Sequence, residues 1–482
     1  MKKIFFVLLV LSHLTTSAQI QQQYSLLEAI TKGQSESPTF RLIETERQIS
    51  FFQYQAYKSD FRPQISVYGN LPVFNKEFYG VRQPDGTIRY QSISQNNANL
   101  GISLSQQILF TGGELSLNTD LTRFDDFKAK TRQYSGTPIY LRLTQPIFAV
   151  NPLKWQKKIE PIRFLQASKE FFTEMEEIAR QVVLLYFDVI DAQTNIDISI
   201  VNLANTEANY EIEKKRIDLG TTTEDKLLQL ELQTLRSRQE LEKAKYQHQL
   251  AQLRLSSFIG ITKNIELNLG LPENIPSFTV NIEDAFKYAK NYRPEFNMFE
   301  KKKLEATRDV EVAKSAKRQV NLVASYGLNN IGDQIGSIYQ NPNDQQRFSI
   351  GFNVPIVDWG RRNARYNTAK AIEKLTSVNN EFDEQTIYQE IVTLVKNITL
   401  LRSNIVLARK TDSVANRRFT LANNLYQIGK LSVTDLNLAQ LEKDNARRTY
   451  ILSLRDFWSS YYQLRKATLF DFEKNQPLFT KD

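Results

Sequence analysis

Two hydrophobic periodicities divide the chain into helical and strand-forming stretches. Residues 162–259 and 361–476 each contain one glycine and no proline, and they are rich in Leu, Gln, Glu, Lys, Arg and Ala. These residue types favour helices. The lone glycines, Gly220 and Gly429, stand where a helix would end in a tight turn. Each stretch therefore predicts two long antiparallel helices. The first helix of the second stretch, 361–428, would be about 100 Å long.

A heptad pattern indicates that these helices pack as coiled coils. In the second stretch the apolar positions are spaced alternately by three and four residues, which is the spacing of a coiled-coil seam. They are Ile391, Leu394, Ile398, Leu401, Ile405 and Ala408. The positions 209 residues earlier keep the pattern and are Val182, Leu185, Val189, Ala192, Ile196 and Ser199.

Other stretches alternate apolar and polar residues, which predicts strands with one apolar face. The apolar positions are Leu100, Ile102, Leu104 and Ile108; Leu115, Leu117 and Leu121; Ile139, Leu141 and Leu143; Val320, Leu322, Ala324 and Tyr326; and Phe348, Ile350, Phe352, Val354 and Ile356. Residues 64–70 are a weaker case. Strands of about nine residues with this alternation are typical of a membrane β-barrel. A soluble β-sandwich alternates in the same way.

The number of strands predicts an oligomer. The second half of the chain offers two strands and the first half at most four, whereas the smallest membrane barrels have eight. An open sheet edge in lipid would leave backbone groups without hydrogen bonds. If the strands cross a membrane, the barrel must therefore be closed between chains.

The sequence also repeats itself. Ala29 and Pro38 match Ala285 and Pro294, and Arg62 matches Arg318, all at an offset of 256 residues. Farther along, Pro146 matches Pro355 and Gly220 matches Gly429 at an offset of 209. Such a long repeat predicts a duplicated structural unit whose first copy carries about 47 extra residues between Arg62 and Pro146.

These patterns predict the domain organisation. We expect a signal peptide at 1–18, a first repeat at 19–275 and a second repeat at 276–482. The first repeat would contain strands over about 62–148, with an inserted hairpin, and a helical hairpin at 150–260. The second would contain strands over about 318–357 and a helical hairpin at 358–470.

The N-terminus predicts export from the cytoplasm. Lys2 and Lys3 precede an apolar run, residues 4–11, and Thr16-Ser17-Ala18 provides small residues for cleavage after Ala18. Beyond this segment no run of 18 apolar residues occurs, so no transmembrane helix is expected in the mature chain. Without Lys2 and Lys3 the chain has 60 basic and 53 acidic residues, a net charge of +7.

The composition argues against several function classes. The basic residues are scattered along helical stretches, which is typical of solvated helix faces and not of a nucleic-acid site. The chain has no cysteine and only two histidines, His13 and His248. Disulfides, thiolate metal sites and histidine-based catalytic triads are thereby excluded. No phosphate-binding loop is present. We expect no enzyme, no cofactor and no metal.

Several phrases together resemble one family. They are the repeated Ala29/Pro38 and Ala285/Pro294 pattern, TQPIF (144–148), VPIVDWG (354–360) and the turn YQIGKLSVTDLNLAQLE (426–442). The chain resembles the TolC-like outer-membrane efflux proteins over essentially its whole mature length.

The resemblance implies a fold and a function. The fold is a mixed α/β membrane protein, in which a trimer shares a twelve-stranded barrel, four strands per chain, continued by a long helical coiled-coil tunnel in the periplasm. The function is a passive exit duct for drugs, other small molecules or secreted proteins. The partners are a periplasmic adaptor and an inner-membrane pump of the resistance-nodulation-division or ABC class. The open alternative is a periplasmic coiled-coil scaffold or adaptor without a channel.

The resemblance also assigns roles to individual residues. Tyr426 matches an aromatic residue that latches the tunnel entrance, and Asp435 matches a carboxylate that lines the constriction, where a trimer would present a ring of three. The adaptor-docking turns match Gly220, Thr221, Thr222, Ile428, Gly429 and Leu431. An alternative role for Asp435 is that of a solvated residue stabilising a helix N-terminus.

The sequence departs from the family in two places. A second entrance carboxylate is replaced by Leu438, and the first-half counterpart of Asp435 is Lys226. Lys226 would pair with Asp435 or shift the entrance towards anions. The 47 additional residues around FTGGE (110–114) predict a hairpin that either widens the barrel to eighteen strands or forms a rim element outside the membrane.

Overall fold

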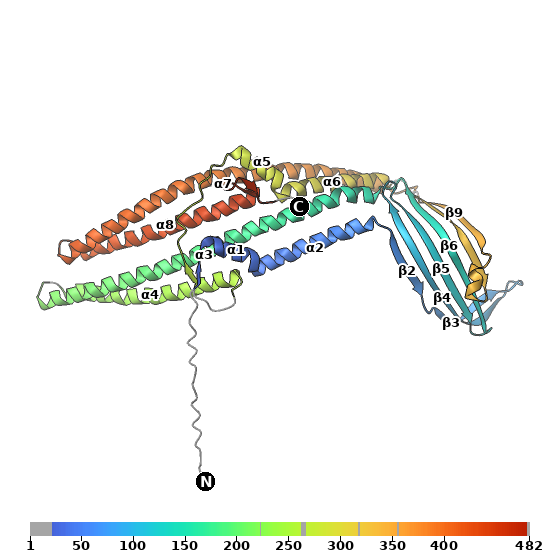
Figure 1. Cartoon of the computed structure of the whole chain (residues 1–482), viewed down its shortest axis with the longest axis horizontal. Coiled ribbons are helices and arrows are strands. Elements are labelled where there is room, and N and C mark those ends of the chain that lie inside the picture. The colour runs from blue at the N-terminus through green and yellow to red at the C-terminus, as the bar shows by residue number, and fades with distance from the viewer. Residues whose placement is uncertain (1–21, 222, 262–266, 317–318, 354–355, 480–482) are drawn as a thin grey trace, which may run out of the picture. The chain divides into compact units, whose positions relative to one another are not determined.

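The computed structural model describes residues 22–221, 223–261, 267–316, 319–353 and 356–479. The expected signal peptide, 1–18, lies outside the described residues, as do Arg318 and Pro355. Figure 1 colours the chain from the N-terminus in blue to the C-terminus in red. The helices are α1 (Leu26–Glu36), α2 (Pro38–Asp60), α3 (Pro152–Asp218), α4 (Glu224–Phe258), α5 (Ile282–Tyr292), α6 (Pro294–Ser315), η1 (Ile335–Tyr339), α7 (Arg361–Gln427) and α8 (Val433–Thr468). The strands are β1 (Gln22–Tyr24), β2 (Gln64–Asn70), β3 (Phe74–Arg82), β4 (Ile88–Ile108), β5 (Gly113–Asp126), β6 (Thr131–Ile147), β7 (Leu267–Leu269), β8 (Gln319–Gly332), β9 (Asn343–Asn353), β10 (Phe470–Asp471) and β11 (Gln476–Pro477).

The chain forms two compact units, and each takes segments from both halves of the sequence. The helical unit comprises Met1–Glu46, Lys169–Arg293 and Ile387–Asp482. The sheet unit comprises Arg47–Ser168 and Pro294–Thr386.

The same series of helices occurs twice. Ser25 caps α1 by accepting a hydrogen bond from the Glu28 backbone N–H, and the Glu28 carboxylate accepts from the Ser25 N–H. This reciprocal capping box satisfies two backbone donors at the helix start. Asn281, 256 residues later, caps α5 with its side-chain oxygen. Pro38 and Pro294 then begin α2 and α6, a position that proline tolerates because the first helical N–H needs no partner.

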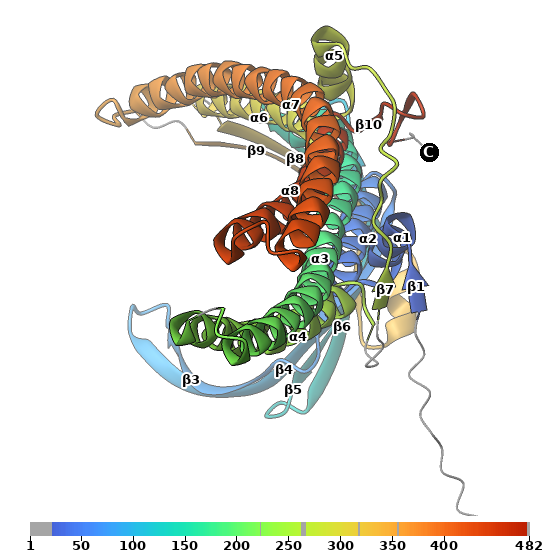
Figure 2. The same cartoon turned by 90° about the vertical axis from the view of Figure 1, so that its left-hand side faces the viewer.

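In the helical unit the long helices lie side by side in the order α7, α8, α3, α4, along an arc that Figure 2 shows. Polar contacts join each neighbouring pair. Ser460 on α8 lies 3.4 Å from the Asn397 amide on α7. Asn202 on α3 donates to Asp444 on α8 at 2.9 Å, and Arg238 on α4 pairs with Glu207 on α3 at 2.8 Å. The two hairpins thus form one curved wall.

The predicted heptad seams lie in the core of this wall. Ile391 and Val182, which are equivalent in the repeat, are both 0% exposed. Most other members of the two seams are also buried, and they are Leu394, Ile398, Ile405, Ala408, Val189 and Ala192. Burial of apolar side chains in this register stabilises long helices that would be marginal alone.

A buried ion cluster joins α3 to the end of α8. The Arg465 guanidinium makes two hydrogen bonds to the Glu176 carboxylate, at 2.8 and 2.9 Å, and a third to Asp471 at 3.0 Å. Beside it, Lys466 lies 3.1 Å from the Glu177 carboxylate, which also pairs with Arg180 at 2.6 Å. Although burial alone raises it, hydrogen bonds from these cations and from a neighbouring amide hold the pKa of Glu177 at about 2.

One helix, α7, contains an 18-residue window that is long and apolar enough to cross a membrane by composition alone. A packed helix of a water-soluble domain passes the same test. In α7, Arg402 donates two hydrogen bonds to the Phe278 and Pro276 carbonyls, the latter at 3.0 Å. This contact holds α7 against the segment that precedes α5.

The sheet unit contains one antiparallel sheet of seven strands. Its order is β2, β4, β5, β6, β8, β9, and β3 also pairs with β4. Because β2 pairs with residues 99–105 of β4 and β3 with residues 88–96, both lie along the same side of β4, opposite β5. The seven strands thus occupy six positions, and the curved sheet (Figure 2) has free edges at β2 and β9.

The two faces of the sheet are inverted relative to a water-soluble protein. On β5, Leu115 and Leu117 are 38% and 39% exposed, whereas Ser116 and Asn118 between them are each 7% exposed. The Asn118 amide donates to the Ser116 hydroxyl at 2.9 Å. The polar side chains are thus covered by one another and by their neighbours, and the apolar side chains face outwards.

The structure corrects the sequence expectations in two places. The first half contributes five strands and not four at most, because β3 follows β2 after a break at Pro72, which has no N–H to donate to a ladder. β9 is described as far as Asn353, Val354 lies outside the described residues, and Ile356, which was expected in the strand, does not belong to it. Helix α3 begins at Pro152, inside the range 150–260 expected for the first helical hairpin, and it continues through Pro161.

Candidate functional site

The turn between α3 and α4 is closed by backbone hydrogen bonds around a left-handed glycine. Gly220 has φ +67°, a conformation that favours glycine. The Thr221 N–H donates to the Arg216 carbonyl at 2.9 Å, and the Gly220 N–H donates to the Ile217 carbonyl at 2.8 Å. The Thr221 hydroxyl also donates to the Arg216 carbonyl at 3.0 Å. These bonds satisfy the last carbonyls of α3. Thr222 lies outside the described residues.

The turn between α7 and α8 repeats this geometry. Gly429 has φ +75°. Its N–H donates to the Tyr426 carbonyl at 2.9 Å, and the Lys430 N–H donates to the Leu425 carbonyl at 2.9 Å. The prediction that both lone glycines end a helix is therefore confirmed.

Each turn presents an apolar side chain directly before its glycine. Leu219 is 76% exposed and Ile428 is 64% exposed, and the two positions are 209 residues apart. Leu431, in contrast, is half-buried against a small core formed by Ala422, Tyr426, Leu436 and Ala439. Ile428 was among the predicted docking residues and Leu219 was not, although the repeat offset alone could have identified Leu219.

Tyr426, the predicted latch residue, is buried. It is 2% exposed, and burial raises the pKa of its hydroxyl. The Arg216 guanidinium, from the other hairpin, lies 5.7 Å from the centre of the Tyr426 ring. Arg216 also pairs with the buried Glu213 carboxylate at 3.1 Å. This contact joins the two hairpins close to their tips.

The basic run Lys214-Lys215-Arg216 is exposed except for one of its members. Lys214 and Lys215 are exposed, but Arg216 is half-buried between Glu213 and Tyr426. The spacing of Glu213 and Arg216, which allows an ion pair within one helix turn, was the available signal.

Asp435 occupies the first turn of α8. Its backbone N–H donates to the Ser432 hydroxyl at 3.1 Å, and the Ser432 hydroxyl lies 2.6 Å from the Asp435 carboxylate. This is the helix-stabilising arrangement that the sequence offered as the alternative role for Asp435. It leaves the carboxylate exposed to solvent and compatible with a place in a tunnel lining.

Lys226 lies in the first turn of α4 and is exposed. Across the described ranges no ion pair joins Lys226 to Asp435 within one chain. The pore roles of both residues stay predictions. Leu438, which replaces the second expected carboxylate, is 49% exposed.

Polar side chains also join α3 to α8 over a longer distance. On α3 they recur every seven residues, at Asp188, Asn195 and Asn202. Their partners on α8 are Arg455 at 3.4 Å, Arg448 at 2.8 Å and Asp444 at 2.9 Å. Hydrogen bonds therefore join the two helical hairpins. The strength of such an interface depends on hydrogen-bond geometry and on the access of water more than that of an apolar seam does.

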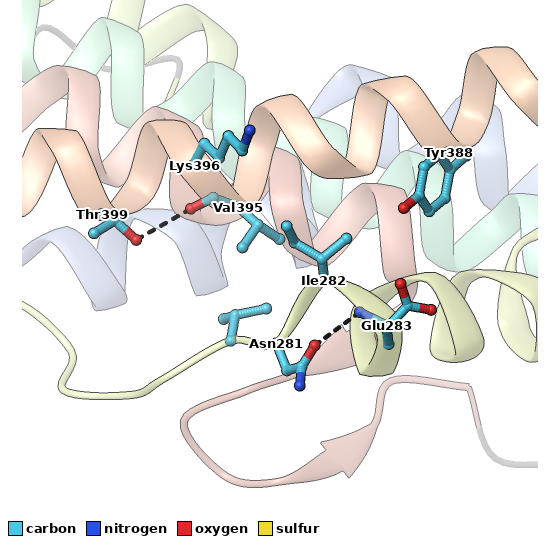
Figure 3. Close-up of a pocket in the computed structure, with 8 residues that line it drawn as sticks. Asn281, Ile282, Glu283, Tyr388, Val395, Lys396 and Thr399 are labelled. Atoms are coloured by element: carbon cyan, nitrogen blue, oxygen red, sulfur yellow. Dashed lines mark hydrogen bonds between the residues drawn. The ribbon is translucent and has the colours of Figure 1, made fainter.

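A shallow groove of about 560 Å³ lies in the helical unit between the start of α5 and α7 (Figure 3). Tyr388, Lys396 and Thr399 line it from α7, and Asn281 and Glu283 from α5. The Asn281 and Thr399 side chains are engaged with the backbone at Glu283 and Val395, so the groove offers no converging reactive groups. Among the residues that the structure describes, no three His, Asp or Glu side chains are arranged to hold a metal ion.

Comparisons with known proteins agree with this geometry. Residues 118–261 and 288–468 match the outer membrane efflux protein family, which is more than half of the chain. No curated protein matches the sequence. Among solved structures, CusC is 15% identical, with a TM-score of 0.65 over 92% of this chain and 91% of CusC. The CmeC outer membrane channel of Campylobacter jejuni is 15% identical, with a TM-score of 0.65 over 95% of this chain and 87% of CmeC.

A third similar structure is the MtrE outer membrane channel of Neisseria gonorrhoeae in its open state. It is 14% identical, with a TM-score of 0.63 over 92% of this chain and 88% of MtrE. At such identities the structural likeness establishes a common fold. The family match goes further: the chain belongs to the outer membrane efflux protein family, and it resides in the outer membrane with its helical part in the periplasm.

Proposed function

We propose that three copies of this chain form a passive exit duct of a tripartite efflux or type I secretion system. The duct conducts drugs, other small molecules or secreted proteins from the periplasmic tunnel to the exterior. A periplasmic adaptor links it to an inner-membrane pump of the resistance-nodulation-division or ABC class. The observation that carries the proposal is an open sheet with an exposed apolar face, in the same chain as two long helical hairpins with matching tips.

The sheet supports the membrane part of the duct. Exposed apolar side chains on one face suit lipid, and the polar face suits a water-filled lumen. Because the sheet edges at β2 and β9 have unpaired backbone groups, lipid requires that they pair with another chain. A soluble scaffold, the alternative considered from the sequence, would instead cover its apolar face.

The hairpin tips support the docking of an adaptor. Leu219 and Ile428 are exposed apolar side chains on turns held rigid by backbone hydrogen bonds. Gly220 and Gly429 carry no side chain that would keep a partner's backbone away. Thr221, Thr222 and Leu431 complete the proposed contact surface. Repetition of the same tip in both halves would give a trimer six related contacts.

The entrance is assigned to Tyr426, Asp435 and Lys226. Tyr426 with Arg216 holds the two hairpin tips together and thereby latches the entrance. Three symmetry-related Asp435 carboxylates would form a ring that attracts cations, while Lys226 would oppose that preference.

Charge reversal at the entrance tests this assignment. In planar lipid bilayers, purified Asp435→Lys should show an altered cation-to-anion permeability ratio. The matched control is Asp456→Lys, the same change at an exposed α8 position farther from the tip. Channels with unchanged selectivity would remove Asp435 from the pore, and a protein that never forms channels would contradict the duct itself.

Adaptor docking needs a cellular test. Leu219→Asp combined with Ile428→Asp should abolish efflux-dependent drug resistance, while the amount of protein in the outer membrane stays unchanged. Ile428→Leu, which keeps the apolar surface, should preserve resistance. Full resistance in the double aspartate variant would place the adaptor elsewhere.

A further inference from the structure

The first half of the chain supplies more of the sheet than the second half does. The second half contributes β8 and β9, and the first half contributes β2 to β6. The additional residues of the first half fall within β3, β4 and β5 and the turn around Gly112. The sequence left open whether they enter the barrel or form a rim.

The hairpin of β4 and β5 runs the full height of the sheet. At the end nearest the helix α3, the Asn151 amide donates to the Leu109 carbonyl in the β4–β5 turn at 2.7 Å. From there the two strands stay paired from Ile108 and Gly113 to Gln95 and Asp126. At the far end, the Phe127 N–H donates to the Ser94 carbonyl at 2.9 Å. The strands of a rim element outside the membrane would instead be paired with the sheet at one end only.

The apolar face of this hairpin is in register with its neighbours. Side chains directly opposite one another in adjacent antiparallel strands lie on the same face. The apolar pairs form two neighbouring rows on this face. One row runs from β2 to β8 through Ile65, Leu104, Leu117, Leu141 and Tyr326, which lies opposite Gln346 on β9, and the other runs from β6 to β9 through Leu143, Ala324 and Phe348. Apart from Leu143 and Ala324, these side chains are exposed.

The opposite face is polar in the same register. Ser66 pairs with Ser103, Ser103 with Asn118, Ser116 with Arg142, and Arg142 with Ser325. The β4–β5 hairpin therefore has the same two faces as β8 and β9, at the same height. The apolar and polar faces of the hairpin have to match those of β8 and β9 only if all six strand positions cross the same lipid layer.

From this register we infer that the β4–β5 hairpin is a transmembrane part of the shared barrel, and that the β9 edge of one copy pairs with the β2 edge of the next. Successive positions are antiparallel, so β9 runs antiparallel to β2 and the ring closes without a parallel step. The inference rests on the proposed trimeric duct. Three copies then give an eighteen-stranded barrel.

The consequence is a wider exit through the outer membrane. Barrel diameter grows roughly in proportion to strand number, so eighteen strands give about 1.5 times the diameter of the twelve that the family resemblance implies. The additional hairpin would therefore admit bulkier cargo at the barrel without any change in the helices.

Cysteine reporters can test the membrane location, because the chain has no cysteine of its own. Single variants Leu104→Cys and Ser103→Cys report on β4, and Ile350→Cys and Ser349→Cys are matched controls on β9. In proteoliposomes, a water-soluble maleimide should label the two serine sites and spare Leu104 and Ile350. Labelling of both β4 sites, with alternation kept on β9, would overturn the inference. Loss of alternation on β9 as well would contradict the proposed duct.

Cross-linking tests the closure of the ring. Ser349→Cys on β9 is combined in turn with Gln64→Cys, Ser66→Cys or Tyr68→Cys on β2, which samples the unknown register. At least one pair should yield a reductant-sensitive trimer on denaturing gels. A trimer formed instead with Ser116→Cys on β5 would make β5 the edge strand, reduce the barrel to twelve strands and overturn the inference.

Discussion

The two halves of the chain are nearly equal in their helices and unequal in their strands. Helices α3 and α7 both have 67 residues, α4 and α8 have 35 and 36, and α1 and α5 have 11 each. The sheet, in contrast, takes five strands from the first half and two from the second. Long helices packed along a common seam must keep matching lengths and registers. A sheet can accept a further hairpin between existing strands, because each strand pairs only with its neighbours.

A second difference lies within the helical unit. The buried Glu176 and Arg465 have no charged counterparts in the other half of the repeat, where the equivalent positions are Gln385 and Ser256. The ion cluster therefore fixes the end of α8 against α3 by a contact that the repeat does not duplicate. Variants can separate the features that depend on the repeat from those that are unique to one half.

The largest loss of stability is expected at this unique cluster. Arg465→Met would leave the buried Glu176 carboxylate without its main partner, which typically costs about 3–5 kcal/mol. We expect the free energy of unfolding in detergent to fall by that amount. The double variant Arg465→Met with Glu176→Gln should recover much of the loss. A single variant as stable as the parent would show that the cluster does not hold the two helices together.

The heptad seams should respond to truncation in both halves. Ile391→Ala should lower the free energy of unfolding by about 2–5 kcal/mol, because it removes buried methyl groups and leaves a cavity. Val182→Ala, at the equivalent position, should cost less since fewer atoms are lost. Val406→Ala, at a position 69% exposed, is the control and should change stability little. An equally small effect at Ile391 would place the seam outside the core.

Acid should weaken the contacts of Glu177 with Arg180 and with Lys466. The pKa of Glu177 is about 2 in the folded chain, against 4.5 for an unperturbed glutamate. A lowered pKa means that the stabilisation is present above pH 4.5 and is lost as the pH falls towards 2. Unfolding curves across this range should show a smaller decline for Lys466→Met, which is less stable at neutral pH. If the parent and Lys466→Met lost the same stability as the pH falls, the contact with Lys466 would play no part in the response to acid.

The hairpin tips should behave alike. Gly220→Ala and Gly429→Ala place a Cβ at positive φ, which costs roughly 1–2 kcal/mol. Because both turns are close to the end of a hairpin, we expect local fraying to increase, measured by amide hydrogen exchange at residues 216–221 and 425–430. Unequal protection in the two variants would show that the tips are not equivalent.

The smallest effect is expected at Tyr426. Its hydroxyl is buried and has no hydrogen-bond partner in the described part of the chain. Tyr426→Phe should therefore leave stability within about 1 kcal/mol or raise it slightly. Tyr426→Ala is the contrasting variant: loss of the ring should disturb the contact with Arg216 and increase the channel's open probability in bilayers. A destabilised phenylalanine variant would point to a hydroxyl contact between chains.

Sequence periodicity predicted the helices because their pattern is long and internally repeated. The seams at Ile391 and Val182 and the turns at Gly220 and Gly429 follow directly from spacing and glycine placement. The strands were harder to predict. β3 was missed because charged residues such as Lys76 and Glu77 interrupt its alternation. Its partner is the first part of β4, residues 88–96.

The candidate site was only partly predictable. Glycine turns and exposed apolar residues such as Ile428 can be found from a single sequence. The contact of Arg216 with Tyr426 cannot, because it joins side chains about 200 residues apart across two hairpins, and a cation in a basic run gives no sign of burial. Asp435 shows a related limit. The sequence supports both a helix-capping role and a place in a pore ring. A ring needs three chains, and a single chain contains only the cap.

The mass of the purified protein in detergent tests the central claim most directly. The full chain has a mass of 55.9 kDa. Light scattering of protein extracted from the outer membrane, corrected for bound detergent, should give the mass of three mature chains. A stable monomer in the membrane fraction would contradict the shared barrel, since its six strand positions would have to close without partners.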